Sequence, residues 1–177
     1  WDDASGELGF WADNAFEFYA ADLVVDADGS HVFAAGSGIA ILEPPNLGLE
    51  LPLIEEGVGG VAGISAIVHA AMAPDGGHLY VTSNGAEQTI AIFATPRFDF
   101  LAADVDGAAA PGLGGASSVV VTPDGENVYV AGALDAAIQL FERDPASGVL
   151  DPIGSVANGV GQIAGLLGVR AVVPADG

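Results

Sequence analysis

The sequence predicts an all-β protein built from a repeated unit of about four short strands. Three observations support this fold class. Asp-Gly turns recur along the chain, alternating apolar runs flank each turn, and no segment shows a helical period with caps. The aspartates of these turns are Asp28, Asp75, Asp124 and Asp176, which gives a repeat of about 50 residues. We therefore expect about three complete four-stranded units, flanked by strands of incomplete ones.

Each unit repeats the same order of elements. A β-branched strand leads into the Asp-Gly turn, a second strand leaves it, and another alternating run follows. Glycine suits such a turn because it takes positive φ without steric cost. The strand–turn–strand runs are 23–34, 71–81 and 119–130, and the later runs are 39–42, 90–93 and 138–141.

A four-stranded unit that recurs every ~40–50 residues is typical of a β-propeller blade. We expect a single propeller segment with blades at about 20–56, 67–106 and 116–157. Partial strands of further blades are expected within 1–19 and 168–177. Three blades alone would leave open sheet faces. The segment is thus expected to be part of a larger propeller, or to be completed by partner copies.

A motif supports this interpretation. Residues 119–130 read Val-Val-Val-Thr-Pro-Asp-Gly-Glu-Asn-Val-Tyr-Val, and residues 141–150 read Phe-Glu-Arg-Asp-Pro-Ala-Ser-Gly-Val-Leu. This pattern resembles the lactonase-like β-propellers, the 6-phosphogluconolactonase-like group. The resemblance covers nearly the whole chain and implies the fold. It implies little about activity, because the same blade motif occurs in propellers with unrelated tasks.

Composition excludes several functions. The chain has 24 Asp and Glu against 3 Lys and Arg, with a net charge of −21, so it cannot neutralise a nucleic-acid backbone. It has no cysteine, which excludes disulfides and thiolate sites. The uncharged runs 57–74 and 152–169 are rich in glycine and recur in the repeat, so we interpret them as loop plus buried strand, with no membrane span. The acidity fits a salt-tolerant organism or an extracellular setting, and we expect an extracellular, periplasmic or cell-surface location.

One column of polar residues could form a site. The residues six places before the four turn aspartates are Asp22, His69, Ser118 and Arg170. They would begin the innermost strands and converge at the mouth of the central channel, where propellers usually bind ligands. The lactonase-like resemblance implies a histidine at such a strand start, and His69 matches it best. The alternative is that strand entries are simply polar and solvated.

Other motifs favour structural roles. His31 and His78 occupy equivalent positions after the turn, so we expect them to support the blade, for example by bonding turn backbone. The Gly-rich stretches 57–63 and 159–165 recur at equivalent connections and lack a βαβ unit, which favours a structural loop over a dinucleotide site. Asp104 and Asp106 are a weak candidate for calcium, because the later ligands of a calcium loop are missing.

Aromatic residues are concentrated near the N-terminus. We consider Trp11, Phe16, Phe18 and Tyr19 as a partner-binding patch. The alternative is that these rings pack locally at a blade junction.

The sequence leads to two functional hypotheses. The first is a non-enzymatic binding or assembly module, a secreted or surface-associated subunit that binds a protein partner or the copies or segments that complete the ring. The second is a lactone hydrolase, in which His69 would be the general base or an anchor for the ligand, and Arg170 would bind the carboxylate or the lactone oxygen. A phosphorylated lactone is disfavoured because phosphate sites use several cations. No cofactor is expected beyond the weak calcium candidate.

Overall fold

The fold consists of three antiparallel sheets, each a meander of four strands. The computed structural model describes residues 19–43, 48–49 and 53–173. The strand orders are β1-β2-β3-β4, β5-β6-β7-β8 and β12-β11-β10-β9. Strands that are adjacent in sequence pair with one another, which is the topology of a propeller blade. The predicted all-β class and the three complete blades are confirmed, and none of the described residues forms a helix able to cross a membrane.

The three blades follow one another along the chain. Blade 1 contains β1 (Ala20–Val25), β2 (Val32–Gly36), β3 (Ile39–Glu43) and β4 (Gly48–Leu49). Blade 2 contains β5 (Ile67–Met72), β6 (His78–Ser83), β7 (Thr89–Ala94) and β8 (Asp99–Val105). Blade 3 contains β9 (Ala116–Val121), β10 (Asn127–Gly132), β11 (Ala137–Arg143) and β12 (Leu150–Ala157).

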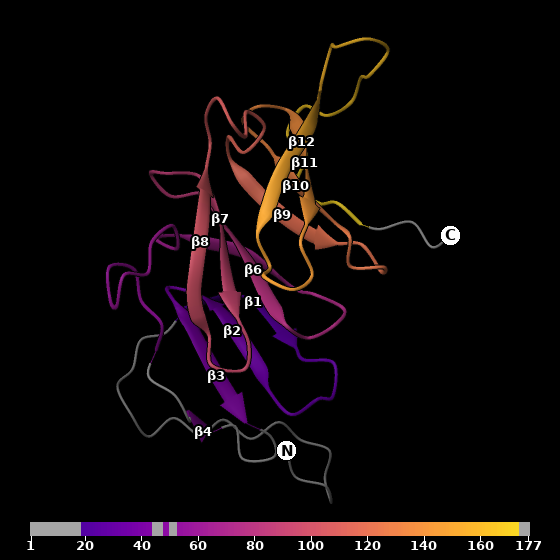
Figure 1. The fold of residues 1–177 in the computed structure, drawn as a ribbon. Coiled ribbons are helices and arrows are strands. Elements are labelled where there is room, and N and C mark those ends of the chain that lie inside the picture. Colours follow the sequence, from indigo (N-terminus) through magenta and orange to yellow (C-terminus); the bar gives the residue numbers. More distant parts are fainter. Residues whose placement is uncertain (1–18, 44–47, 50–52, 174–177) are drawn as a thin grey trace, which may run out of the picture.

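Blade 2 lies between the other two blades, as Figure 1 shows from the indigo first blade to the orange third. Its inner strand β5 contacts both β1 and β9. Strands β6 and β7 are buried along nearly their whole length. The strands β1 and β12 are mostly exposed, because no described sheet covers the outer faces of blades 1 and 3.

Alternation along the strands of blade 2 builds two cores. Leu79 and Val81 of β6 pack toward blade 1, whereas Tyr80 packs toward blade 3. In β7, Phe93 joins the first core and Ile92 the second. Burial of each such side chain contributes about 1.5–3 kcal/mol. We call the interface of blades 1 and 2 the first junction, and that of blades 2 and 3 the second junction.

The two glycine-rich loops adopt the same turn. The Gly57 N–H donates to the Val61 carbonyl (2.9 Å), and the Gly159 N–H donates to the Ile163 carbonyl (2.8 Å). Gly57 and Gly159 have φ values of 78° and 81°, a region that favours glycine. The interpretation of these stretches as structural loops is confirmed.

The expected partial strands have different outcomes. Residues 1–18 lie outside the described part of the chain, and so do residues 174–177. The described residues 168–173 form no strand, because an inner strand pairs with the second strand of its own blade and none is described there. They remain tied to blade 3, since the Ser117 hydroxyl donates to the Val169 carbonyl (3.2 Å).

Candidate functional site

Three of the four predicted channel residues lie at equivalent positions of the inner strands. Asp22, His69 and Ser118 are the third residues of β1, β5 and β9. In each strand the pairing register shifts immediately before this residue. A bulge of this kind redirects the following side chain.

Each of these side chains accepts a hydrogen bond from the backbone of the next inner segment. The donors and acceptors are Ala70 N–H to Asp22 Oδ2 (2.9 Å), Val119 N–H to His69 Nδ1 (3.4 Å) and Val172 N–H to Ser118 Oγ (3.3 Å). The column is thus a repeated connection from one blade to the next. Arg170, the fourth member, is exposed.

His69 and Asp22 face each other across the first junction. His69 Nε2 lies 3.7 Å from Asp22 Oδ2, and both side chains are partly exposed. Since Nδ1 accepts the Val119 N–H, the proton of a neutral His69 is on Nε2. A general base needs a nitrogen lone pair directed at the substrate. In this arrangement the one nitrogen lone pair of a neutral His69 already accepts the Val119 N–H, so it is not directed at a substrate.

A second polar cluster is buried in the second junction. The Arg143 side chain is fully buried, and its guanidinium donates to Asp75 Oδ2 (2.7 Å), Gly125 O (2.9 Å), Tyr80 Oη (2.8 Å) and His78 Nδ1 (3.1 Å). The Tyr80 hydroxyl in turn donates to the Gly148 carbonyl (2.9 Å). The arginine is therefore paired with a carboxylate and satisfied by neutral acceptors, as a buried cation requires.

The charge of this cluster explains the pKa shifts of its members. Burial, together with the nearby Arg143 cation, lowers the pKa of His78 below its ordinary value of 6.5. For Asp75, burial alone would raise the pKa, but hydrogen bonds from the Gly77 N–H and Arg143 outweigh it and lower the pKa. Asp75 is therefore ionised and His78 neutral at pH 7.

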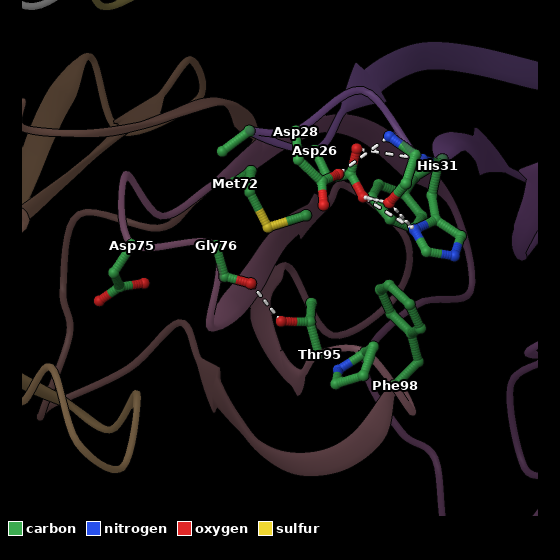
Figure 2. Close-up of a pocket in the computed structure, with 12 residues that line it drawn as sticks. Asp26, Asp28, His31, Met72, Asp75, Gly76, Thr95 and Phe98 are labelled. Atoms are coloured by element: carbon green, nitrogen blue, oxygen red, sulfur yellow. Dashed lines mark hydrogen bonds and ion pairs between the residues drawn. The ribbon is translucent and has the colours of Figure 1, made fainter.

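A pocket of about 320 Å³ opens at the first junction. Figure 2 shows Asp26, Asp28 and His31 along one wall, with Thr95 and Phe98 opposite. These walls come from the β1–β2 turn and the β7–β8 turn. Burial alone would raise the pKa of Asp26, but hydrogen bonds from His31 and Ser30 outweigh it and lower the pKa. The pocket therefore presents the ionised Asp26 carboxylate, with an aromatic side chain on the opposite wall.

Comparison with solved structures identifies the architecture. The chain is similar to the periplasmic gluconolactonase PpgL from Pseudomonas aeruginosa, with a TM-score of 0.62 and 22% identity over 76% of this chain. It is similar to a candidate 6-phosphogluconolactonase from Bacteroides fragilis, with a TM-score of 0.60 and 20% identity over 77% of this chain. The chain has the fold of the lactonase-like β-propellers. The WD40 repeats of RRP9 also match this propeller, with a TM-score of 0.64 and 16% identity over 82% of it.

The propeller described here spans only part of those proteins. It covers 39% of PpgL, 38% of the Bacteroides fragilis protein and 40% of RRP9. No family model and no curated protein matches its sequence. The likeness therefore establishes the fold of the propeller, and function must be argued from its own residues.

Two further predictions concern the aromatic residues near the N-terminus and the acidic pair Asp104 and Asp106. Tyr19 is described and 75% exposed, whereas Trp11, Phe16 and Phe18 lie outside the described residues. Asp104 is half-buried at the end of β8, and its pKa is raised by burial and by the nearby Asp151. No cluster of three metal-binding side chains occurs among the described residues. The structure thus brings together Asp22 and His69 but builds no larger set around Asp104 and Asp106.

The two turn histidines of the propeller have different partners. His31 Nδ1 bonds Asp26 Oδ2 (2.8 Å), which lies five residues earlier in the same turn between β1 and β2. His78 Nδ1 instead bonds Arg143 from the next blade. Both residues make the structural contacts expected of them: His31 bonds a side chain of its own turn, whereas His78 bonds Arg143 and the Ser147 backbone in the next blade. The Arg143 cluster was missed because its members are far apart in sequence. The available signal was that Arg143 stands in the recognised motif of a chain with only 3 Lys and Arg.

We expect His78 to make the propeller less stable in mild acid. The pKa of His78 is lowered in the folded state, so its contribution is fully present above pH 6.5 and is lost as the pH falls through the folded pKa. Asn127 occupies the same position in blade 3, which makes His78→Asn a suitable variant. The difference in melting temperature between the wild type and His78→Asn should narrow from neutral pH to about pH 5.

The control for this pH series is His31→Asn, at the equivalent position away from Arg143. The pH dependence of His78→Asn is compared with that of this control, which leaves the contact between His78 and Arg143 in place. If the melting temperatures of the wild type and His78→Asn stay parallel over the same range, neutral His78 does not support the cluster.

Proposed function

We propose that this propeller segment is a non-enzymatic binding and assembly module, secreted or associated with the cell surface. The observation that carries the proposal is that the polar residues at the starts of the inner strands bond the neighbouring blade. Asp22, His69 and Ser118 all accept backbone hydrogen bonds between blades. The histidine that the family resemblance implies for a catalytic role is therefore engaged in holding blades together.

The outer faces of the segment support an assembly role. Blade 1 exposes Leu23 and Val25 on β1, and blade 3 exposes Leu134, Ile153 and Val156. Exposed apolar side chains at both ends of a blade stack are surfaces that a neighbouring blade or partner would cover. Further propeller segments or copies of this chain fit those faces. The net charge of −21 suits a hydrated, extracellular setting.

A lactone hydrolysis assay tests this proposal. Glucono-1,5-lactone is a suitable substrate, because a neutral lactone places no demand on the few cations of the chain. We expect the wild type and His69→Ala to hydrolyse it equally, at the uncatalysed rate. His31→Ala serves as the control, since that histidine lies outside the channel column.

The opposite result would favour the lactone hydrolase. A wild-type rate well above the uncatalysed one, lost in His69→Ala and kept in His31→Ala, would contradict the non-enzymatic role. A general base contributes about 10²–10⁴-fold to a rate, so the assay resolves such a difference easily. The melting temperature of His69→Ala should be measured alongside, because the variant also loses an interblade hydrogen bond.

A further inference from the structure

The two blade junctions are built from equivalent residues, but only the second contains a buried arginine. Thr95 comes directly after β7 in blade 2, and Arg143 is the last residue of β11, the equivalent strand of blade 3. Their backbone amides donate to equivalent carbonyls, those of Gly77 (2.9 Å) and Glu126 (2.8 Å). Their side chains do the same: the Thr95 hydroxyl donates to the Gly76 carbonyl, as the Arg143 guanidinium donates to the Gly125 carbonyl. Thr95 therefore occupies the position of Arg143.

The shorter side chain of Thr95 leaves room that Arg143 fills in the other junction. The pocket of about 320 Å³ lies at this place, with the Thr95 hydroxyl directed at the Gly76 carbonyl in Figure 2. The groups that bind Arg143 have counterparts here at matching repeat positions: Asp28 for Asp75, His31 for His78, Phe33 for Tyr80 and Gly76 for Gly125. All four counterparts line the pocket.

The charge of the pocket also matches a cation. Asp26, Asp28 and Asp75 line it, and no lysine or arginine does. Because Asp75 is already paired with Arg143 and Asp26 with His31, Asp28 is the carboxylate that remains for a ligand. Among the described residues, Asp28 is engaged only through Oδ1, by the Ser30 N–H (2.9 Å). Arg97 stands in the adjacent turn but is exposed and does not line the pocket. The site thus offers the Asp28 carboxylate and the Gly76 carbonyl, and neither is bound by a guanidinium of this chain among the described residues.

We propose that the pocket of the first junction binds the guanidinium group of an arginine side chain carried by a protein partner. The inference rests on the proposed role as a binding module and gives the chemistry of its partner. Asp28 and the Gly76 carbonyl would bind the guanidinium as Asp75 and Gly125 bind Arg143. Phe33 would replace the Tyr80 ring, whose centroid lies 6.0 Å from Arg143 Cζ.

An arginine side chain fits better than a free small cation for two reasons. The pocket wall includes the apolar side chains of Met72, Pro96 and Phe98, which suit the methylene stem of an arginine. The net charge of −21 attracts a basic protein and speeds its encounter.

Peptide titration of the full chain tests the proposal. The probe is a short capped peptide with one central arginine, and the matched control carries citrulline, which has nearly the same shape but no charge. We expect the arginine peptide to bind at least about tenfold more tightly than the citrulline peptide. Equal affinities would overturn the proposal. Binding of free arginine as tight as that of the peptide would overturn the assignment to a protein partner.

Variants then locate the site. Asp28→Asn should weaken binding of the arginine peptide about tenfold, whereas Asp124→Asn, at the same turn position in blade 3 but outside the pocket, should not. Thr95→Arg should fill the pocket with the chain's own guanidinium, abolishing peptide binding and raising the melting temperature. Unchanged peptide affinity in Thr95→Arg would refute the site.

The outcomes also separate this inference from the function on which it rests. A chain that neither hydrolyses the lactone nor binds the arginine peptide would refute this pocket while leaving the non-enzymatic module standing. A chain that hydrolyses the lactone through His69 would refute the module, whatever the peptide does.

Discussion

Replacing Arg143 with methionine should lower the free energy of unfolding by about 3 kcal/mol. Methionine keeps much of the length of the side chain but removes all four hydrogen bonds of the guanidinium. The Gly125 carbonyl and the Tyr80 hydroxyl would then lose a partner in a buried place. The loss is limited because the Asp75 side chain is 44% exposed, so water can solvate its carboxylate.

Urea unfolding at neutral pH measures this change. Arg97→Met is the matched control, because Arg97 is exposed, and it should change stability by less than about 0.5 kcal/mol. Arg143→Lys should fall between the two, since an ammonium keeps the charge but cannot reach all four acceptors in the fork geometry. A loss of less than about 0.5 kcal/mol in Arg143→Met would show that the cluster does not hold the second junction.

Gly148→Ala should destabilise the propeller by about 2–4 kcal/mol. Gly148 has a φ of 73°, which already disfavours alanine. A Cβ at this position would also lie 2.1 Å from Cδ2 of His78, far inside van der Waals contact. The substitution would therefore push the ring away from Arg143 and disturb the cluster from the other side.

Gly159→Ala separates the two causes of this loss. Gly159 has a φ of 81°, and a Cβ added there would meet nothing within 4 Å, so the variant should lose only about 1 kcal/mol from the backbone. A loss in Gly148→Ala no larger than that in Gly159→Ala would show that contact with His78 is unimportant.

The fold could be predicted from the sequence because every blade repeats the same local signals. Turn glycines such as Gly29, Gly76 and Gly125 all have positive φ, between 70° and 75°, as the Asp-Gly pattern requires. Alternation along β6 and β7 placed apolar residues on both faces, which only a blade covered on both sides can bury. Each of these signals lies within a short stretch of sequence, and each recurs in every blade, so the repeat makes the pattern easy to recognise.

The site could be predicted only in part. The repeat placed Asp22 and His69 at equivalent strand starts, and the structure brings them to 3.7 Å. It could not reveal that their side chains accept amides of the next blade, because that depends on a bulge in each inner strand. The sequence also could not show that Thr95 and Arg143 occupy equivalent positions with different partners, because the partners of Arg143 in the preceding blade are far away in sequence.

The inequality of the junctions bears on how the chain comes apart. In a repeat protein, stability is distributed over the interfaces of neighbouring units. The second junction is fastened by an ionic cluster, whereas the corresponding space in the first junction is an open pocket. We therefore expect blade 1 to separate first on unfolding, while blades 2 and 3 persist as a pair. A partner's arginine bound in the first junction would stabilise the contact between blades 1 and 2. Unfolding would then be more cooperative when the partner is bound than when it is absent.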